Sequence, residues 1–403
     1  FSSGDPETDA NPSATGITTT GRFASYHFGT AATIQANFGQ LGFTYTPPSG
    51  YLALSTANLP DPAIDPAQGS SPEDYFNTVL YTGNSGTGSP STQAITGVGF
   101  QPDFLWLKDR TSTRNHILID QLRGDSTFLK SNLTDAEATN ADVVASLDSD
   151  GFTVGVAATC NFLNNSYVAW NWKANGSGVS NTDGTITSTV SANTESGFSI
   201  VSYTGNNSPA TIGHGLASAP EMVIGKRRGD SGDWQVYHKD LTSAAYTVEL
   251  QDTKAQSGNA AFNSTDPTSS VFSIGGVLDN ADDYIAYCFH SVEGFSKFGG
   301  YTGNGSSDGA FVYTGFRPAF VMIKRTDASG NGWLMIDSAR DVYNVAGQEL
   351  FANSSADEDP RDDLDLLSNG FKCRRNGGNF NSSGYTYIYM AFAENPFKYS
   401  LAR

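Results

Sequence analysis

One unit of roughly 100 residues recurs three times along this chain, and this internal repeat limits the possible fold more than any other feature. Each copy opens with Tyr-Thr-Gly-Asn, continues through an apolar run that ends in Lys, and closes with an aromatic-rich block. The opening motifs begin at Tyr81, Tyr203 and Tyr301, and the closing blocks begin at Tyr167, Tyr284 and Tyr387. Two further blocks lie between the apolar run and the closing block, so each copy has five blocks in the same order. We therefore expect three similarly folded modules in tandem.

The repeated blocks have the character of β-strands. They are short, rich in β-branched and aromatic residues, and bounded by Gly, Asn, Asp and Pro. In the first closing block Val168, Trp170 and Trp172 share one face, and the other face is mixed. One buried face and one partly covered face are typical of a sandwich of two antiparallel sheets. The sequence therefore predicts an all-β fold, with three tandem β-sandwich repeats of jelly-roll type after a short β-rich N-terminal segment.

The domain boundaries follow from the repeat. We expect a β-rich segment over residues 1–60, a linker over 61–74, copy 1 over 75–174, copy 2 over 175–297 and copy 3 over 298–403. Copy 2 includes a linker that begins Asn-Gly-Ser-Gly and continues as a strand near residues 185–190. Two helical exceptions are predicted: a helix over residues 135–147, capped by Asp135, and a short helical turn over 362–367.

Composition and charge exclude several classes of protein. Only 38% of the residues are hydrophobic and 16% are charged, and Gly, Ser, Thr and Asn fill the difference, which argues against a coiled coil or a helical bundle. A formal charge of −18 disfavours nucleic acid and anionic membrane surfaces, and no apolar run is long enough to span a membrane. The three cysteines lie far apart without metal-ligand spacing, so we expect buried thiols and no cofactor.

The third repeated block, which runs from His116 to Asp120, from Trp234 to His238 and from Trp333 to Asp337, supplies the candidate binding residues. An aromatic ring can stack on the apolar face of a sugar while a neighbouring acid or imidazole binds a hydroxyl group. The alternative is that these side chains pack between the copies or against a neighbouring subunit. A lysine ends the second block of every copy, at Lys108, Lys226 and Lys324, and is expected either to pair with a carboxylate at the sheet edge or to touch a ligand. The candidate binding residues are His116, Asp120, Trp234, His238, Trp333 and Asp337.

A catalytic site is not predicted. The paired-carboxylate motif of sandwich glycosidases, Glu-x-Asp-x-x-Glu on one strand, does not occur. No copy combines His with Ser and Asp at equivalent positions, and the residue type at His116 and His238 changes between copies. The acidic run from Asp357 to Asp365 is interpreted as an exposed loop, with a calcium site as the alternative, so metal binding stays open.

The N-terminal segment resembles the C-terminal end of a SPRY-type domain. The resemblance rests on Asn37-Phe-Gly-Gln and on Phe43-x-Tyr-x-Pro-Pro-x-Gly-Tyr51, which together cover about 25 residues. A full domain of that type is much longer. The resemblance therefore implies that only its final part is present and that more chain precedes Phe1.

The three-copy region resembles a repeat of virion proteins of tailed phages, especially marine and cyanobacterial ones. The phrases that carry the resemblance begin at Ile95, Tyr167, Gly294, Val312 and Met390. It implies concanavalin A-like sandwiches, a place on the virion surface beside other virion proteins, and, by analogy with fibres, a homotrimer. The expected function is a distal tail-fibre or spike part that binds a host surface glycan or receptor without catalysis. The alternatives are a structural decoration protein of capsid or tail, and a virion-associated glycan hydrolase.

Overall fold

The computed structural model describes residues 56–400 apart from 87 and 89. The chain divides into two compact units, residues 1–61 and 62–403. The segment that resembles a SPRY-type domain lies outside the described residues, except for a 3-10 helix over Thr56–Asn58. Two further 3-10 helices, η2 (Pro66–Gln68) and η3 (Pro72–Asp74), lead into copy 1.

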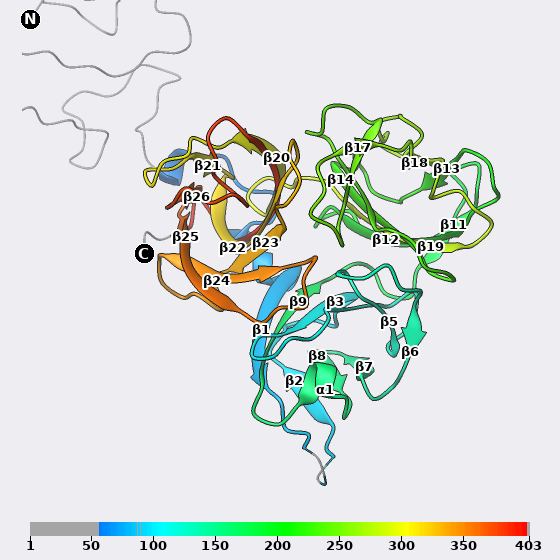
Figure 1. Cartoon of the computed structure of the whole chain (residues 1–403), viewed down its shortest axis with the longest axis horizontal. Coiled ribbons are helices and arrows are strands. Elements are labelled where there is room, and N and C mark those ends of the chain that lie inside the picture. The colour runs from blue at the N-terminus through cyan, green and yellow to red at the C-terminus, as the bar shows by residue number, and fades with distance from the viewer. Residues whose placement is uncertain (1–55, 87, 89, 401–403) are drawn as a thin grey trace, which may run out of the picture. The chain divides into compact units, whose positions relative to one another are not determined.

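The prediction of an all-β sandwich fold is confirmed (Figure 1). Copy 1 has a six-stranded sheet in the order β1-β9-β3-β4-β5-β6, which faces a three-stranded sheet in the order β2-β8-β7. The pairs between its named strands are all antiparallel, and the one α-helix among the described residues is the single turn α1 (Ala158–Asn161). Its strands are β1 (Phe76–Thr82), β2 (Gln93–Thr96), β3 (Phe104–Asp109), β4 (Ile117–Asp120), β5 (Thr127–Leu129), β6 (Ala138–Thr139), β7 (Val144–Asp148), β8 (Gly151–Val154) and β9 (Ser166–Trp172).

Copies 2 and 3 repeat this plan with larger sheets. Copy 2 has the order β10-β11-β12-β19-β14-β15-β16-β17 beside the pair β13-β18, and copy 3 has one continuous sheet, β20-β27-β22-β23-β24-β25-β26-β21. The strands of copy 2 are β10 (Val179–Asn181), β11 (Ser188–Asn193), β12 (Phe198–Thr204), β13 (Ala210–Gly213), β14 (Met222–Arg227), β15 (Gln235–His238), β16 (Tyr246–Glu249), β17 (Ser257–Gly258), β18 (Val271–Ile274) and β19 (Asp283–Phe289). Those of copy 3 are β20 (Ser296–Thr302), β21 (Phe311–Tyr313), β22 (Phe316–Arg325), β23 (Trp333–Asp337), β24 (Ala346–Phe351), β25 (Asp359–Leu367), β26 (Gly370–Cys373) and β27 (Thr386–Pro396).

The three larger sheets turn one face toward a shared aromatic core. This central core draws Trp106, Trp170, Trp234 and Trp333 from different copies into one cluster. The opposite face of each large sheet packs against the smaller strands of its own copy, so each copy also has a private core. The large sheets are therefore buried on both faces. The face that was expected to be only partly covered forms a second apolar interface. This explains why β3 is buried along its whole length.

The Tyr-Thr-Gly-Asn motif has the same structural role in each copy. Its tyrosine stacks on the first tyrosine of the closing strand, with ring centroids 5.0, 5.1 and 5.2 Å apart in copies 1, 2 and 3. Its glycine approaches the backbone of a neighbouring loop: a Cβ on Gly83, Gly205 or Gly303 would lie within 2.4 Å of a carbonyl oxygen. Only glycine fits there. The motif thus packs the opening strand of each copy against the closing strand and a neighbouring loop.

Both helix predictions are wrong. Residues 135–147 contain β6 and the start of β7, where Val144 and Leu147 are buried in the private core of copy 1. Residues 362–367 belong to β25, which also takes up most of the acidic run that was expected as an exposed loop. In both cases pairing with a neighbouring strand overrides local helix propensity. No helix among the described residues is long and apolar enough to cross a membrane.

Candidate functional site

The structure places all six predicted binding residues inside the molecule. His116, Asp120, Trp234, His238, Trp333 and Asp337 are each at most 1% exposed. A sugar can stack on none of these rings in this structure. The prediction of a sugar platform on the third block is therefore corrected, and the six residues take part in the alternative role, which is packing between the copies.

A cyclic set of hydrogen bonds joins the three copies through the first residue of the third block. The indole nitrogen of Trp234 donates to the carbonyl of Lys130 in copy 1 at 3.0 Å, and that of Trp333 donates to Glu249 in copy 2 at 2.9 Å. His116 closes the cycle, because its Nε2 lies 3.0 Å from the carbonyl of Phe351 in copy 3. The three acceptors hold equivalent register positions: Glu249 and Phe351 are the last residues of β16 and β24, and Lys130 directly follows β5. We call this set the inter-copy ring.

His116 can take the role that tryptophan has in the other two copies, because its hydrogen bonds fix one tautomer of the imidazole ring. The indole N–H of Trp106 donates to its Nδ1 at 2.8 Å, so Nε2 carries the proton and donates, as an indole would. Burial holds the pKa of His116 well below its usual range, and the nearby Lys108 lowers it further. The neutral ring is thus a hydrogen-bond donor in the inter-copy ring.

A second set of contacts uses the last residue of the third block. Tyr287 of copy 2 donates to Asp120 at 2.8 Å, and the indole of Trp170 in copy 1 donates to Asp337 at 3.0 Å. Each aspartate also pairs at 2.6 Å with a fully buried arginine, Arg123 or Arg340. In copy 2 the equivalent residue is His238, whose Nε2 lies 3.3 Å from the carbonyl of Tyr389.

The three repeated lysines bind backbone carbonyls, which corrects the expectation that they pair with carboxylates. Lys108 Nζ donates to the carbonyl of Asp109 at 2.5 Å, Lys226 to that of Arg227 at 2.7 Å, and Lys324 to that of Asn331 at 2.6 Å. All three are at most 1% exposed. Burial lowers the pKa of each to about 8.

The acidic run is held by arginines. Glu358 binds Arg110 at 2.7 Å and Arg340 at 3.2 Å, and Asp363 binds Arg375 at 2.5 Å. Burial and the adjacent Glu349 raise the pKa of Asp363. Within residues 56–400, as far as they are described, no group of three or more His, Cys, Asp and Glu side chains is placed to hold a metal ion. The alternative of a calcium site in this run therefore finds no support in the geometry.

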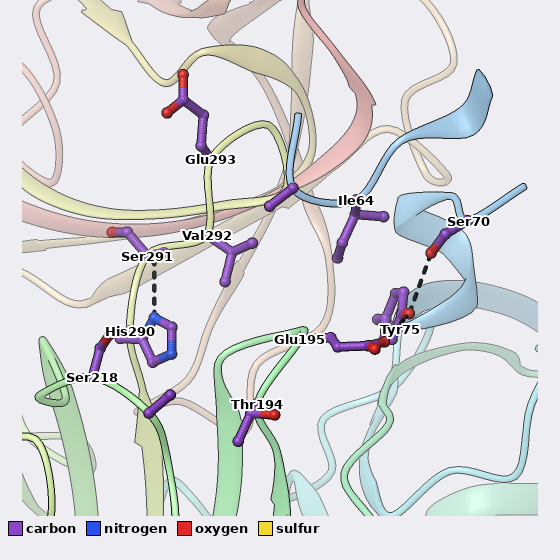
Figure 2. Close-up of a pocket in the computed structure, with 12 residues that line it drawn as sticks. Ile64, Ser70, Tyr75, Thr194, Glu195, Ser218, His290, Ser291, Val292 and Glu293 are labelled. Atoms are coloured by element: carbon purple, nitrogen blue, oxygen red, sulfur yellow. Dashed lines mark hydrogen bonds between the residues drawn. The ribbon is translucent and has the colours of Figure 1, made fainter. Parts of the chain in front are cut away.

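A pocket lined by both polar and apolar groups lies where the chain passes from the linker into copy 1 and from copy 2 into copy 3 (Figure 2). We call it the junction pocket. Its volume is about 630 Å³, which is in the range of small-molecule sites. It is lined by Ala63, Ile64, Ser70, Tyr75, Thr194, Glu195, Ala217, Ser218, His290, Ser291, Val292 and Glu293.

Hydrogen bonds fix the polar groups of the junction pocket. The hydroxyl group of Tyr75 donates to Glu195 at 2.7 Å and lies 3.2 Å from the hydroxyl oxygen of Ser70. Burial raises the pKa of Tyr75, and the Glu195 carboxylate raises it further against the opposing effect of Ser70, so the phenol stays protonated. Glu195 itself sits in a turn that Asn193 holds, because the Asn193 side-chain oxygen accepts the amides of Glu195 and Ser196 at 3.1 Å.

His290 forms the opposite wall of the junction pocket (Figure 2). Its Nδ1 lies 3.0 Å from the carbonyl of Ser291, and its buried Nε2 has no hydrogen-bond partner in the described part of the chain. The backbone amide of His290 donates to Gly197 at 2.9 Å. Gly197 has a φ of +68°, and a Cβ there would lie 2.9 Å from the imidazole Cε1. A glycine is therefore required for His290 to take this position.

The chemistry of the junction pocket favours a neutral ligand with several hydroxyl groups. Glu195 and Glu293 are exposed acceptors that repel phosphate and other anions, while Thr194 and Ser218 both donate and accept. The ring of Tyr75 and the side chains of Ile64 and Val292 supply apolar area beside them. Saccharides combine these two kinds of surface.

Sequence reasoning missed the junction pocket because its residues lie outside the repeated blocks. They come from the linker before copy 1, from the insertion before copy 2 and from the segment after β19. The one available signal is a break in the repeat: the position of His290 holds Lys173 in copy 1 and Ala393 in copy 3, by the shared register of β9, β19 and β27.

The fold and the pocket together define a class: a tandem three-sandwich protein built around one shared aromatic core, with the junction pocket between its copies. Residues 71–396 match the model of a family described as a domain of unknown function, DUF7483, and the chain belongs to this family. No curated protein and no solved structure matches the chain significantly.

Proposed function

We propose that this chain is an outer virion protein of a tailed phage, the distal part of a tail fibre or spike, and that it binds saccharides of the host surface without cleaving them. The resemblance of the repeats to phage virion proteins supports the location. The observation that carries the binding role is the junction pocket, where Tyr75 and Glu195 form a fixed donor–acceptor pair beside apolar side chains. Loops at the ends of sandwiches are common recognition sites.

The test is a binding experiment with an array of bacterial capsular and O-antigen polysaccharides. We expect the chain to bind a subset of them. Tyr75→Phe and Glu195→Gln should each weaken the strongest interaction by about tenfold or more, because the first removes the hydroxyl group that donates to Glu195 and the second replaces a charged acceptor by a neutral one. Glu73→Gln is the matched control, since Glu73 is an exposed glutamate outside the pocket.

Each other outcome contradicts part of the proposal. Absence of binding to every polysaccharide would favour the structural decoration role instead. Equal binding by Tyr75→Phe, Glu195→Gln and the unmodified chain would move the site away from the junction pocket. Release of reducing ends during incubation would mean that the chain is a glycan hydrolase.

A further inference from the structure

The strand β21 lies at the end of the copy 3 sheet and presents two aromatic side chains at its free edge. It pairs with β26 on one side and with no strand on the other. Val312 points into the private core of copy 3, whereas Phe311 is 48% exposed and Tyr313 is 57% exposed. Both rings stand on the outer face of the sheet, because residues two apart in a strand share a face.

The backbone of these two aromatic residues is unpaired. The ladder between β21 and β26 uses Ala310, whose carbonyl accepts the amide of Cys373 at 3.0 Å, and Thr314, whose amide donates to Asn369 at 3.0 Å. In an antiparallel pair the residues between such positions point their N–H and C=O groups the other way. Those of Phe311 and Tyr313 therefore face outward, without a hydrogen bond to any described residue.

Copy 2 shows what this edge accepts when it is covered. Its equivalent strand is β13, and the insertion before copy 2 runs along it. The carbonyl of Thr211 accepts the amide of Ile186 at 3.2 Å, the amide of Thr211 donates to the side chain of Thr185 at 2.9 Å, and the carbonyl of Gly213 accepts the Ser188 hydroxyl at 2.8 Å. The outward groups of this edge thus bind an extended segment.

Copy 1 provides the contrast. Its equivalent strand, β2, also has an edge without a paired strand in the described structure, but the positions of Phe311 and Tyr313 hold Ala94 and Thr96. Of the three copies, copy 3 therefore combines the open edge with exposed aromatic rings. Natural edge strands are usually protected by charges, proline or bulges. Residues 309–316 include no charged residue and no proline, although the whole chain carries a net charge of −18.

We infer that the β21 edge binds a second copy of this chain. The two β21 strands pair antiparallel about a twofold axis through Val312, so that Phe311 of each chain lies opposite Tyr313 of the other. This register joins all the outward groups of residues 311 and 313 in four backbone hydrogen bonds and forms two cross-strand aromatic pairs. The spacing of one residue on either side of Val312 makes the edge complementary to itself, which is what an isologous dimer requires.

The first test is sedimentation of the full chain over roughly 1–200 μM in 0.15 M and 0.5 M salt, because screening reduces repulsion between two acidic chains. We expect a monomer–dimer equilibrium that strengthens with salt. Phe311→Lys should weaken dimerisation about thirtyfold or more, since a charge at an edge opposes strand pairing. Ala94→Lys places the same charge at the equivalent edge position of copy 1 and should leave the equilibrium unchanged.

A second test examines the register. Chains with Phe311→Cys and chains with Tyr313→Cys, mixed under oxidising conditions, should form a mixed disulfide dimer faster than either forms a dimer alone, because the proposed register brings these two positions together. The native cysteines are buried and free, so they do not interfere. A monomer at every concentration, a trimer, equal weakening by Ala94→Lys, or disulfides without preference for the mixed pair would each overturn the inference.

Discussion

Replacing Asp120 with alanine is expected to lower the free energy of unfolding by about 3–5 kcal/mol. The side chains of Asp120 and Arg123 are both fully buried, and Nε of Arg123 lies 2.6 Å from the carboxylate. Removing the carboxylate leaves the buried guanidinium with Glu137, at 3.9 Å, as its remaining counter-charge. It also removes the acceptor of the Tyr287 hydroxyl group, so the contact between copies 1 and 2 weakens as well. Urea unfolding followed by tryptophan fluorescence measures the change.

Copy 2 supplies the control for this prediction, because its two residues at the positions of Asp120 and Arg123 form no ion pair. His238 stands in place of Asp120 and Leu241 in place of Arg123, and both are buried. The Nδ1 of His238 accepts the amide of Asp240 at 3.1 Å, as the carboxylate of Asp120 accepts the amide two residues on at 3.1 Å. Burial lowers the pKa of His238 to about 4, so the ring is neutral at pH 7.

The triple variant Asp120→His, Arg123→Leu, Tyr287→Met places the residue types of the contact between copies 2 and 3 at the contact between copies 1 and 2. Methionine is included because Met390 holds the position of Tyr287 in copy 3. We expect the triple variant to recover most of the stability that Asp120→Ala loses, since apolar groups can replace a buried ion pair when both partners are removed. A triple variant as unstable as Asp120→Ala would show that copy 2 depends on other neighbours.

The sequence was sufficient to predict the strands and their alternation, because both follow from local patterns. Val168, Trp170 and Trp172 share one face of β9 as expected, and that face forms part of the central core. The opposite face carries Ala169 and Asn171, which look mixed in the sequence. That face is buried nonetheless, because it packs against a smaller sheet whose position depends on contacts far along the chain.

The inter-copy ring could not be predicted from residue types alone. His116, Trp234 and Trp333 differ in size and chemistry, and their variation argued against a shared role. They share one property, a ring N–H directed at a carbonyl of another copy. Recognising it requires the cyclic arrangement of the three copies and the hydrogen bond from Trp106 that sets the tautomer of His116. Neither appears in a linear pattern.

The failed helix prediction has a similar cause. Residues 135–147 contain several alanines and an N-capping aspartate, which favour a helix locally. In the structure Val144 pairs with Val154 of β8, and Val143 and Leu147 fill the private core of copy 1. The apolar area that these residues bury outweighs a preference worth at most a few tenths of a kcal/mol per residue.

Burial of three lysines is expected to contribute a rise in the free energy of unfolding between pH 8 and about pH 10, with a slope of up to about 1.4 kcal/mol per pH unit for each lysine. Lys108, Lys226 and Lys324 have a pKa of about 8 in the folded chain, and burial is the main cause. An unfolded lysine keeps its proton to about pH 10.4. Between these values the unfolded chain binds more protons, so raising the pH favours the folded state. Below pH 8 the full cost of burying the charges is present.

Single substitutions separate this effect from the rest of the titration. Lys226→Met should remove about one third of the rise, because one of three equivalent groups no longer titrates. Lys254→Met should leave the rise intact: the side chain of Lys254 is exposed, and Asp252 and Glu249 raise its pKa above the window.

The buried thiols of Cys160, Cys288 and Cys373 oppose the lysines above about pH 8.5, because burial raises the pKa of each thiol and they ionise first in the unfolded chain. The buried tyrosines such as Tyr203 and Tyr287, whose pKa burial also raises, do the same above about pH 10. Free energies of unfolding measured from pH 7 to 10.5 test the sign: the unmodified chain should gain stability relative to Lys226→Met as the pH rises, and a constant difference would mean that Lys226 is solvated in the folded chain.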